Sequence, residues 1–579
     1  MKKPDNDPIH DPSDSDRRRF LKTAGATATG AGLMSYLPSA HSRHYNDYTP
    51  AFDYPFTLGV ASGEAKGRSL VLWTRLAPDP LNGGGMPDED VVVKWVVARD
   101  PDMQKVVRKG YAVASPEQGH SLHVKVRGLK ANRWYYYQFI VGDFTSRTGR
   151  TRTLPKRKSD IDKLSFAFVS CQEYQFGYYT AYKHLANEEL DFVIHLGDYL
   201  YEVGFSNPYL PSVRTHVDEE CVTLEQYRNR YAAYQLDENL QAARAAFPFF
   251  HLWDDHEIDN DWATDTPEDW DDQTREDFLI RRQHGMRAYY ENLPLDPALA
   301  PDEEEDKDEV DDDNEMRIYR KIEIGNLARI NLLDCRQYRS DQPCTTGGAK
   351  GSEAPKANPP CPEMCPERFD KSLTMLGERQ EKWLRKNLKR SKAKWNIIAS
   401  TVWLSQFIYD KRDPQTGALI TDADGNAVKL INTDSWDGYP TERQRLLDFI
   451  DKKDISNVVV VSGDWHVNGA MNILQDFNDI SSKILGAEFS CTSISSIGPW
   501  APIMQADMHK DGNQHVHYVN GDNLRAGKDV HGYVICHLNH QQLQTEFRIV
   551  DSVRNWEDGE IGTDATFVVS EGVAGTFQV

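Results

Sequence analysis

The chain has 579 residues, of which 39 % are hydrophobic, and a formal net charge of −22. This length predicts about two to four compact modules. The acidic balance argues against a nucleic-acid partner, whose phosphates would be repelled. No apolar run reaches the roughly 20 residues of a transmembrane anchor.

The first 42 residues predict a Tat-type signal peptide. Arg17 and Arg18 precede an FLK triplet, and a weakly apolar stretch of small residues leads to a cleavage region near Ala40 and Ser42. This order of parts is typical of Tat signals. We therefore expect the Tat translocase as an export partner and a periplasmic or secreted protein. Tat cargo crosses the membrane folded, so a metal can be inserted before export.

Residues 50–155 predict an N-terminal all-β sandwich of the fibronectin-like kind. Short alternating runs such as SLVLWTRL and RWYYYQFIVG are separated by Gly, Pro and Asp, with no helical period between them. Nothing in these runs looks catalytic. The sandwich is therefore expected to serve as a scaffold.

Residues 160–579 predict an α/β catalytic domain. LSFAFVSC, GYYTAYKHLANEEL and DFVIHLGDYLY read as strand, helix and strand, which is a βαβ unit with parallel strands. Further strands are expected within 247–257, 327–337, 395–404, 457–466 and 486–495. A helix is expected within 377–391 and a C-terminal hairpin within 532–553.

Eight cysteines in an exported chain permit disulfides. Cys344, Cys361 and Cys365 lie in one Pro/Gly-rich loop, which one pair could staple, and the sequence leaves the pairing open. A zinc knuckle is less favoured there because no second ligand pair flanks the segment. Three cysteines in strand-like runs are expected to be buried thiols: Cys335, Cys491 and Cys536.

Four predicted strands end on residues that bind metals or protons. In chain order these are Cys171; Asp198 and Tyr201; Asp254, Asp255 and His256; and Asp464 and His466. Each alone has a plain structural alternative, such as a turn or a core position. Together, at the carboxyl ends of parallel strands, they are hard to explain by packing, because clustered carboxylates cost stability unless a cation compensates them. The pattern predicts a multi-metal site.

The motifs GDxxY at 197–201, DHE at 255–257 and GDxH at 463–466 resemble those of the metallophosphoesterase superfamily, including the purple acid phosphatases. The closer resemblance is to PhoD-type alkaline phosphatases. They share the Tat signal, the β-sandwich ahead of the catalytic domain, and SCQ, WDDHE, CRQYRSDQ and SGDWHVN nearly as they stand. The resemblance spans about residues 50 to 575. It implies a four-layer α/β/β/α catalytic domain and hydrolysis of phosphate esters.

The resemblance also implies the ligands of a ferric ion. Asp198 matches the carboxylate that bridges the metals, and Tyr201 matches the phenolate that binds Fe(III). His466 matches a ligand of the same iron. Cys171 stands where other metallophosphoesterases have an aspartate, and in PhoD-type enzymes this thiolate binds the iron.

The second cation site departs from the purple acid phosphatase pattern. Asp255 stands at the Asn of GNHE and Asp464 at the first His of GHxH, and a separate upstream His has no evident counterpart. Replacing nitrogen by anionic oxygen favours a hard cation, so Ca²⁺ fits this site better than Zn²⁺. The residues thus predict iron beside calcium, as the resemblance also implies.

The layout implies attack by a metal-bound hydroxide on the phosphate ester. His256 matches the histidine that contacts the substrate phosphate. Arg336, in DCRQYR, either clamps a phosphate oxygen or forms a structural salt bridge. Asp254, Asn260 and Asp261 are expected to support ligands and not to bind metal themselves.

The expected function is that of an exported, monomeric alkaline phosphatase that acts on phosphate-ester substrates. One alternative is a phosphodiesterase acting on phospholipid head groups or wall polymers. Another is an exported metal-binding surface protein without catalysis. An Arg and a His beside a metal cluster argue against the last, because simple metal binding has no need of them.

Overall fold

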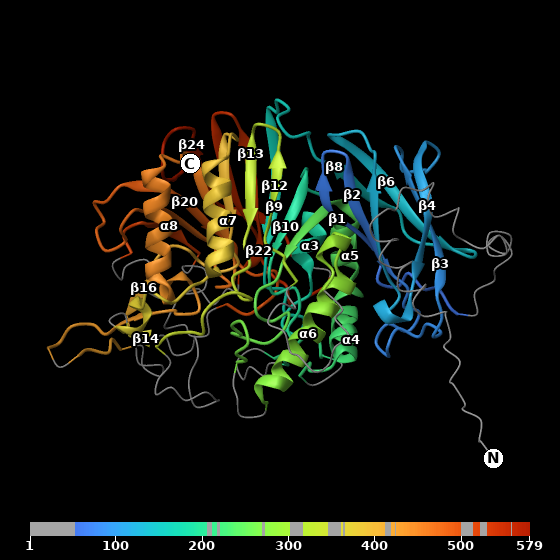
Figure 1. Ribbon diagram of the computed structural model, residues 1–579, viewed down its shortest axis with the longest axis horizontal. Coiled ribbons are helices and arrows are strands. Elements are labelled where there is room, and N and C mark those ends of the chain that lie inside the picture. The colour runs from blue at the N-terminus through green and yellow to red at the C-terminus, as the bar shows by residue number, and fades with distance from the viewer. Residues whose placement is uncertain are drawn as a thin grey trace, which may run out of the picture.

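The structure is a computed structural model. It describes residues 52–204, 211–216, 220–268, 273–301, 316–344, 361–362, 365–410, 418–422, 424–498, 513–520, 530–556 and 559–579. The predicted signal peptide at 1–42 lies outside these residues. The described strands form four sheets, and helices pack on the two larger sheets (Figure 1).

The largest sheet has ten strands and joins the two ends of the described chain. Its order is β25 (Phe577–Gln578), β24 (Ile561–Ser570), β23 (Gln542–Val550), β22 (His531–Asn539), β9 (Lys163–Val169), β10 (Phe192–Leu196), β11 (Pro248–Leu252), β1 (Val60–Lys66), β2 (Ser69–Arg75) and β5 (Ser121–Arg127). The central strands β9, β10 and β11 are parallel, as the βαβ pattern predicted. The strands β22 and β23 form the predicted C-terminal hairpin.

A second sheet has seven strands. Its order is β12 (Arg320–Ile324), β13 (Ala328–Leu332), β15 (Trp395–Ala399), β18 (Val458–Ser462), β20 (Ile484–Ser490), β19 (Gly469–Leu474) and β21 (Val516–Val519). The strands β13, β15, β18 and β20 are parallel. A small sheet of β14 (Cys361–Pro362), β17 (Lys429–Ile431) and β16 (Ile408–Asp410) completes this part of the chain.

The helices begin where the local sequence offers caps. Thr223 and Gln226 form a capping box at α4 (Leu224–Gln235), and Thr274 and Asp277 form one at α6 (Arg275–Asn292). Asp237 caps α5 (Glu238–Ala246). The remaining α-helices are α3 (Thr180–Leu185), α7 (Gly377–Lys389) and α8 (Pro440–Lys452).

Alternate valines of β18 face two different cores. Val459 and Val461 pack in the cluster that includes the ten-stranded sheet, whereas Val458 and Val460 pack with α7 and α8. Each such side chain contributes roughly 1.5–3 kcal/mol by its burial. The helices α3 and α5 contact the ten-stranded sheet through β22 and β1. The predicted mixed α/β fold is thereby confirmed.

The N-terminal strands divide between two sheets. The strands β4 (Val106–Ala114), β3 (Val91–Ala98), β6 (Arg133–Val141), β7 (Phe144–Thr145) and β8 (Gly149–Thr153) form a separate sheet, at the right in Figure 1. The strands β1, β2 and β5 instead extend the ten-stranded sheet, because β1 pairs in parallel with β11. The strands expected over 50–155 are present, but they divide between two sheets, and the sandwich itself stays a prediction. Alternating runs reveal strands, but they do not reveal which partner an edge strand selects.

Of the three loop cysteines, Cys344 and Cys365 are joined in a disulfide, with 6.1 Å between their Cα atoms. The cysteines at 171, 221, 335, 491 and 536 are buried and keep their thiols outside any disulfide. Within the described parts of the chain, no helix combines the length and the apolar character needed to cross a membrane.

Candidate metal centre

Four of the predicted site residues have a left-handed backbone just after a strand ends. Cys171 follows β9, Asp198 follows β10, and Asp464 and His466 follow β18, with φ angles of 58°, 56°, 68° and 55°. Non-glycine residues rarely adopt this conformation, which costs about 1–3 kcal/mol each and concentrates at functional sites. The strand ends are thus held in a conformation that their own backbone preferences oppose.

The glycines before two of these aspartates allow the strand ends to approach closely. Gly197 has φ of +97°, and a Cβ at this position would lie 2.5 Å from Asp254 Cβ. A Cβ at Gly463 would lie 2.7 Å from Ser170 Oγ, at the point where the end of β9 meets the seven-stranded sheet. The Gly-Asp pairs therefore bring the carboxyl ends of both sheets together.

The first group of converging side chains joins both sheets. Cys171, Asp198 and His466 offer ligand atoms that all lie within 4.8 Å of one another. Tyr201 donates its hydroxyl to Asp198 Oδ2 at 2.8 Å, and the Tyr201 hydroxyl oxygen lies 3.2 Å from His466 Nε2. The structure therefore gathers the thiol, carboxylate, imidazole and phenol that were expected around iron. Their role as ligands stays a prediction.

Neighbouring groups orient the imidazole and the phenol. His466 Nδ1 lies 2.5 Å from the Ile497 carbonyl oxygen, which can only accept, so Nδ1 carries the proton. This leaves the lone pair on Nε2, the atom beside Tyr201. Ser496 donates its hydroxyl to the Tyr201 oxygen at 2.9 Å. Such outer contacts fix the tautomer and direction of a metal-binding histidine.

Two further groups of ligand atoms continue from the first. Asp198, Asp255 and His256 form one, and Asp255, Asp261 and Asp434 form the other, each within the same 4.8 Å limit. Asp198 thus belongs to two groups, and so does Asp255. Asp261 was expected only to support ligands, but it stands within the all-carboxylate group.

Two carboxylate oxygens in these groups have no hydrogen-bond donor. Asp198 Oδ1 and Asp255 Oδ1 are fully buried, and neither accepts a hydrogen bond from the described residues, although Asp255 Oδ1 lies 3.4 Å from Arg336 Nη2. A buried carboxylate oxygen is costly unless it is hydrogen-bonded or coordinates a cation. The residues present therefore fit a metal cluster.

The pKa shifts of the site residues also indicate a metal cluster. Burial, followed by the charge of Asp198, raises the pKa of the Cys171 thiol well above its ordinary value. Burial, then Asp198 and Cys171, raises the pKa of the Tyr201 phenol in the same way. Burial also raises the pKa of Asp198, although His256 opposes it. A cation at this position would stabilise the deprotonated forms of Cys171, Tyr201 and Asp198. The raised pKa values therefore fit a site that binds a cation.

Arg336 is fully buried, and its guanidinium group contacts the carboxylates of Asp254 and Asp434. Its Nε donates to Asp254 Oδ1 at 2.7 Å, its Nη2 donates to Asp254 Oδ2 at 2.9 Å, and its Nη1 donates to Asp434 Oδ1 at 2.8 Å. Arg339 donates to the same Asp434 oxygen at 2.6 Å. These contacts support the structural salt bridge over the phosphate clamp, since the guanidinium donors already have carboxylate partners.

Asp464 stands apart from the three groups. It is half-buried like His466, so this edge is where the site meets solvent. Burial, then the charges of Asp254 and Asp434, raises the pKa of Asp464 well above its ordinary value. The negative charges of the acidic cluster thus act on the Asp464 carboxylate, although its oxygens are not among the three groups of converging ligand atoms.

His256 is held by Glu202, which the sequence reasoning missed. His256 Nδ1 lies 2.8 Å from Glu202 Oε2, and its ring lies 4.1 Å from that of Tyr201. Burial would lower the pKa of His256, but Glu202, Asp198 and Asp255 outweigh it and raise the pKa well above 6.5. Nε2 is the ring nitrogen of His256 that does not contact Glu202.

Glu257 connects the residues that follow β10 with those that follow β11. Its carboxylate accepts the backbone N–H groups of Asp198, Tyr199 and Asp254 at 3.1, 2.8 and 2.9 Å. Burial raises the pKa of Glu257 to about 8. As the last residue of DHE it was visible in the sequence, but its bonds to distant backbone atoms were not. It acts as a positioning residue.

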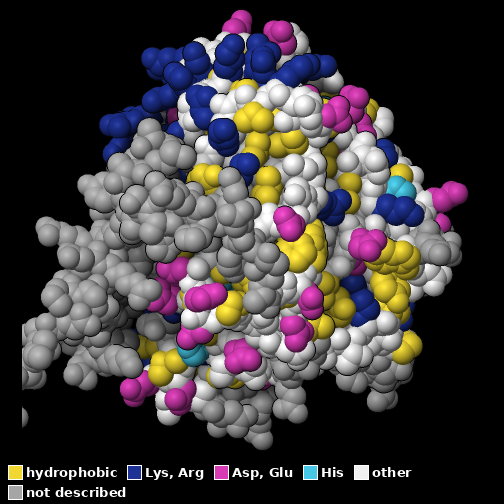
Figure 2. Space-filling model, turned by 90° about the vertical axis from the view of Figure 1, so that its right-hand side faces the viewer, with side chains coloured by type: hydrophobic (Ala, Val, Ile, Leu, Met, Phe, Trp, Pro, Cys, Tyr) yellow, Lys and Arg dark blue, Asp and Glu magenta, His cyan; other side chains and the backbone are white. Residues whose placement is uncertain are grey.

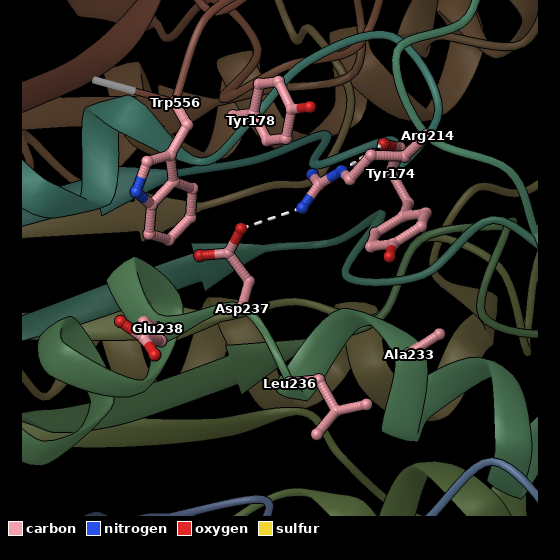
Figure 3. A pocket seen from close by; sticks show the side chains of 8 residues that line it. All are labelled: Tyr174, Tyr178, Arg214, Ala233, Leu236, Asp237, Glu238 and Trp556. Atoms are coloured by element: carbon pink, nitrogen blue, oxygen red, sulfur yellow. Dashed lines mark hydrogen bonds and ion pairs between the residues drawn. The ribbon is translucent and has the colours of Figure 1, made fainter. Parts of the chain in front are cut away.

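A separate pocket of about 370 Å³ opens elsewhere on the surface (Figure 3). Arg214 donates to Asp237 at 2.8 Å across it and stacks on the Tyr174 ring at 3.9 Å, while the Trp556 indole faces the same space. None of the three groups of ligand atoms lines this pocket. Its central charges, Arg214 and Asp237, are paired with each other, and the candidate metal ligands lie elsewhere.

Two sheets meet at a cluster of thiol, phenol, imidazole and carboxylate groups, a set of donors that suits metal ions. The model of the PhoD-like phosphatase family matches residues 166–547, and the model of that family's N-terminal domain matches residues 42–155. The chain belongs to the PhoD-like phosphatase family and is a phosphoric-ester hydrolase. The resemblance drawn from the motifs is confirmed.

Two relatives cover nearly the whole chain. Alkaline phosphatase D of Bacillus subtilis (strain 168) is 41 % identical over 568 residues, which is 97 % of this chain and 89 % of the relative. A solved structure described as that of PhoD is 41 % identical with a TM-score of 0.78, and the match covers 92 % of this chain and 93 % of the other. The similarity therefore extends over both the N-terminal and the catalytic regions.

Proposed function

We propose that the chain is an exported alkaline phosphatase that hydrolyses phosphate esters at an iron–calcium site. The observation that carries this proposal is the continuous row of three ligand groups, linked by Asp198 and Asp255. One end of the row offers thiol, phenol and imidazole, and the other offers carboxylates alone. Donor sets this different suit two different metals.

In this proposal Cys171, Asp198, Tyr201 and His466 hold Fe(III). Asp255, Asp261 and Asp434 hold Ca²⁺ through oxygen, and Asp464 borders them as the predicted further ligand. Arg336 and Arg339 offset part of the negative charge of Asp434. An all-oxygen site at this charge suits a hard cation.

When bound, the cations supply charge that binds the phosphate and acidifies a water. The chain positions the reacting groups. Glu202 orients His256, whose Nε2 donates to a phosphate oxygen or to the departing alcohol. Glu257 holds the backbone of Asp198 and Asp254, so the two strand ends keep their spacing. Arg336 keeps Asp254 and Asp434 in place.

The helix, sheet, sheet and helix order supports the proposed four-layer catalytic domain. The helices α7 and α8 cover the outer face of the seven-stranded sheet, the ten-stranded sheet packs on its inner face, and α3 and α5 contact the ten-stranded sheet. The metal centre then lies where the carboxyl ends of the two sheets meet, as expected for such folds.

The function is tested with p-nitrophenyl phosphate and bis-p-nitrophenyl phosphate, each assayed on protein of known iron and calcium content. Turnover of the monoester at alkaline pH supports the proposal. Exclusive turnover of the diester supports the phosphodiesterase alternative. Fully metallated protein that is inert towards both esters would overturn catalysis altogether.

His256→Gln is expected to lower kcat by about 100-fold or more, because a positioned proton donor typically contributes 10²–10⁴-fold. Iron and calcium contents should not change if His256 addresses substrate alone. Glu202→Gln should give a smaller loss with the same metal contents, since it only weakens the 2.8 Å contact to His256.

His540→Gln, in the turn between β22 and β23, is the matched control and should retain full activity. A loss of metal in His256→Gln would show that His256 is itself a ligand, as its place in the second group allows. Unchanged kcat in the same variant would remove it from the reaction.

Export is part of the proposal and rests on the sequence of the first 42 residues. Replacing Arg17 and Arg18 by lysine should keep the precursor in the cytoplasm, because the Tat pathway reads the arginine pair. Fractionation followed by immunoblotting measures this. Normal export of the double variant would refute the Tat assignment without touching the catalytic proposal.

A further inference from the structure

The N-terminal region carries a charge opposite to that of the whole chain. Residues 99–158 contain fourteen Lys and Arg but only four Asp and Glu, in a chain with a net charge of −22. A charge asymmetry of this size marks an interaction surface more often than a fold requirement. Such a surface requires the folded chain to bring these Lys and Arg side chains close together.

Strand pairing brings several of them to one edge. Arg127 at the end of β5 pairs with the start of β2, and Arg133 at the start of β6 pairs with Thr153 at the end of β8. Arg108 donates to the Arg127 and Gly128 carbonyls, and the Thr153 hydroxyl donates to the Lys130 carbonyl at 2.7 Å. We define the basic edge as Arg68, Arg108, Arg127, Lys130, Arg133 and Lys156.

All six side chains of the basic edge are exposed. None forms an ion pair with a carboxylate of the described residues, and the Arg108 guanidinium bonds only backbone oxygens. Nearby carboxylates are already engaged, since Asp191 pairs with Arg152 and Asp296 pairs with Lys125. On the face of the molecule that lies at the right in Figure 1, Lys and Arg side chains gather at the upper end (Figure 2).

The basic edge lies away from the metal centre. Arg152 near the end of β8 pairs with Asp191, directly before β10, whereas Asp198 is the second residue after β10. The five strand residues of β10 and Gly197 separate the two aspartates, and a strand of this length spans roughly 17 Å at about 3.3 Å per residue. A partner bound at the basic edge therefore leaves the metal centre open.

We propose that the basic edge binds a water-soluble anionic polymer with closely spaced charges, and so holds the enzyme on polyanionic material with its metal centre exposed. Six unpaired cations on one edge release condensed counterions when they meet such a chain, which offsets the repulsion from the acidic remainder. A bilayer is disfavoured as partner. Among the exposed large hydrophobic side chains of the described residues, only Val106 belongs to a strand of this edge, so little is available to insert.

The test uses labelled inorganic polyphosphate as the probe and fluorescence anisotropy with the full-length mature enzyme. Wild type should bind at low salt, and the affinity should fall steeply as salt rises. The triple variant Lys130→Glu, Arg133→Glu, Lys156→Glu should bind at least about tenfold more weakly, since three favourable charges become unfavourable. Its kcat on p-nitrophenyl phosphate and its melting temperature should equal those of wild type.

The matched control is Lys371→Glu, Lys382→Glu, Lys386→Glu, which changes the net charge equally at exposed positions in and near α7. It should keep the wild-type affinity. Equal losses in both triple variants, or no binding by wild type at low salt, would overturn the proposal. Binding to vesicles rich in phosphatidylglycerol without binding to polyphosphate would replace the polymer by a membrane.

Discussion

Cys171→Ala is expected to lose iron, visible colour and activity together. Thiolate and phenolate ligands donate charge to ferric iron in the visible range, so the wild-type protein should be coloured. Activity should fall by more than about 100-fold, because even outer partners of metal ligands typically cost about 10- to 100-fold. Iron content, the absorption spectrum and turnover are measured on the same preparation, and circular dichroism checks the fold.

Cys536→Ala is the matched control for this change. Cys536 is equally buried, but its thiol faces Thr545 and lies in β22, away from the three ligand groups. Both variants lose about 1 kcal/mol of packing if the cysteines are inert. An iron-replete, active Cys171→Ala protein would therefore refute the thiolate assignment and leave Asp198, Tyr201 and His466 as the iron site.

Removal of calcium is expected to abolish activity, and Ca²⁺ but not Zn²⁺ should restore it. Asp255, Asp261 and Asp434 supply only oxygen, and all three are buried. Zinc prefers nitrogen and sulfur in a tetrahedral site, whereas calcium accepts six to eight oxygens. The measurement is turnover of p-nitrophenyl phosphate in excess EGTA, followed by addition of each metal.

The control is EGTA saturated with Ca²⁺ in advance, which should leave activity unchanged. Iron must be measured before and after chelation, so that a loss of iron is not mistaken for a loss of calcium. Full activity in excess EGTA would contradict calcium dependence. Recovery with Zn²⁺ alone would mean that the carboxylate group does not select its metal as proposed.

The strand ends could be predicted because each follows an apolar run. The four valines of β18 are buried on both faces, so a run of this kind reads as a covered strand. Ligands collect at the carboxyl ends of parallel strands, and this places Cys171, Asp198 and His466 at one edge. Periodicity together with one topological rule was therefore sufficient for the first group.

The third group could not be predicted in full from local patterns, because the sequence analysis did not single out Asp434. Asp434 follows no apolar run and joins the site only through the loop that carries it past Arg336 and Arg339. Glu202 and Glu257 are positioning residues whose bonds reach residues more than 50 positions away. The same limit applies to β1, whose pairing with β11 is a tertiary choice.

In the proposed metal centre, iron occupies the end of the row that offers thiol, phenol and imidazole. X-ray diffraction from crystals of the exported protein, recorded on both sides of the iron absorption edge, locates iron directly. We expect an anomalous difference peak enclosed by Cys171, Asp198, Tyr201 and His466, and no iron signal among Asp255, Asp261 and Asp434. A peak that appears only at the zinc edge, or iron seated among the three aspartates, would contradict this placement of iron.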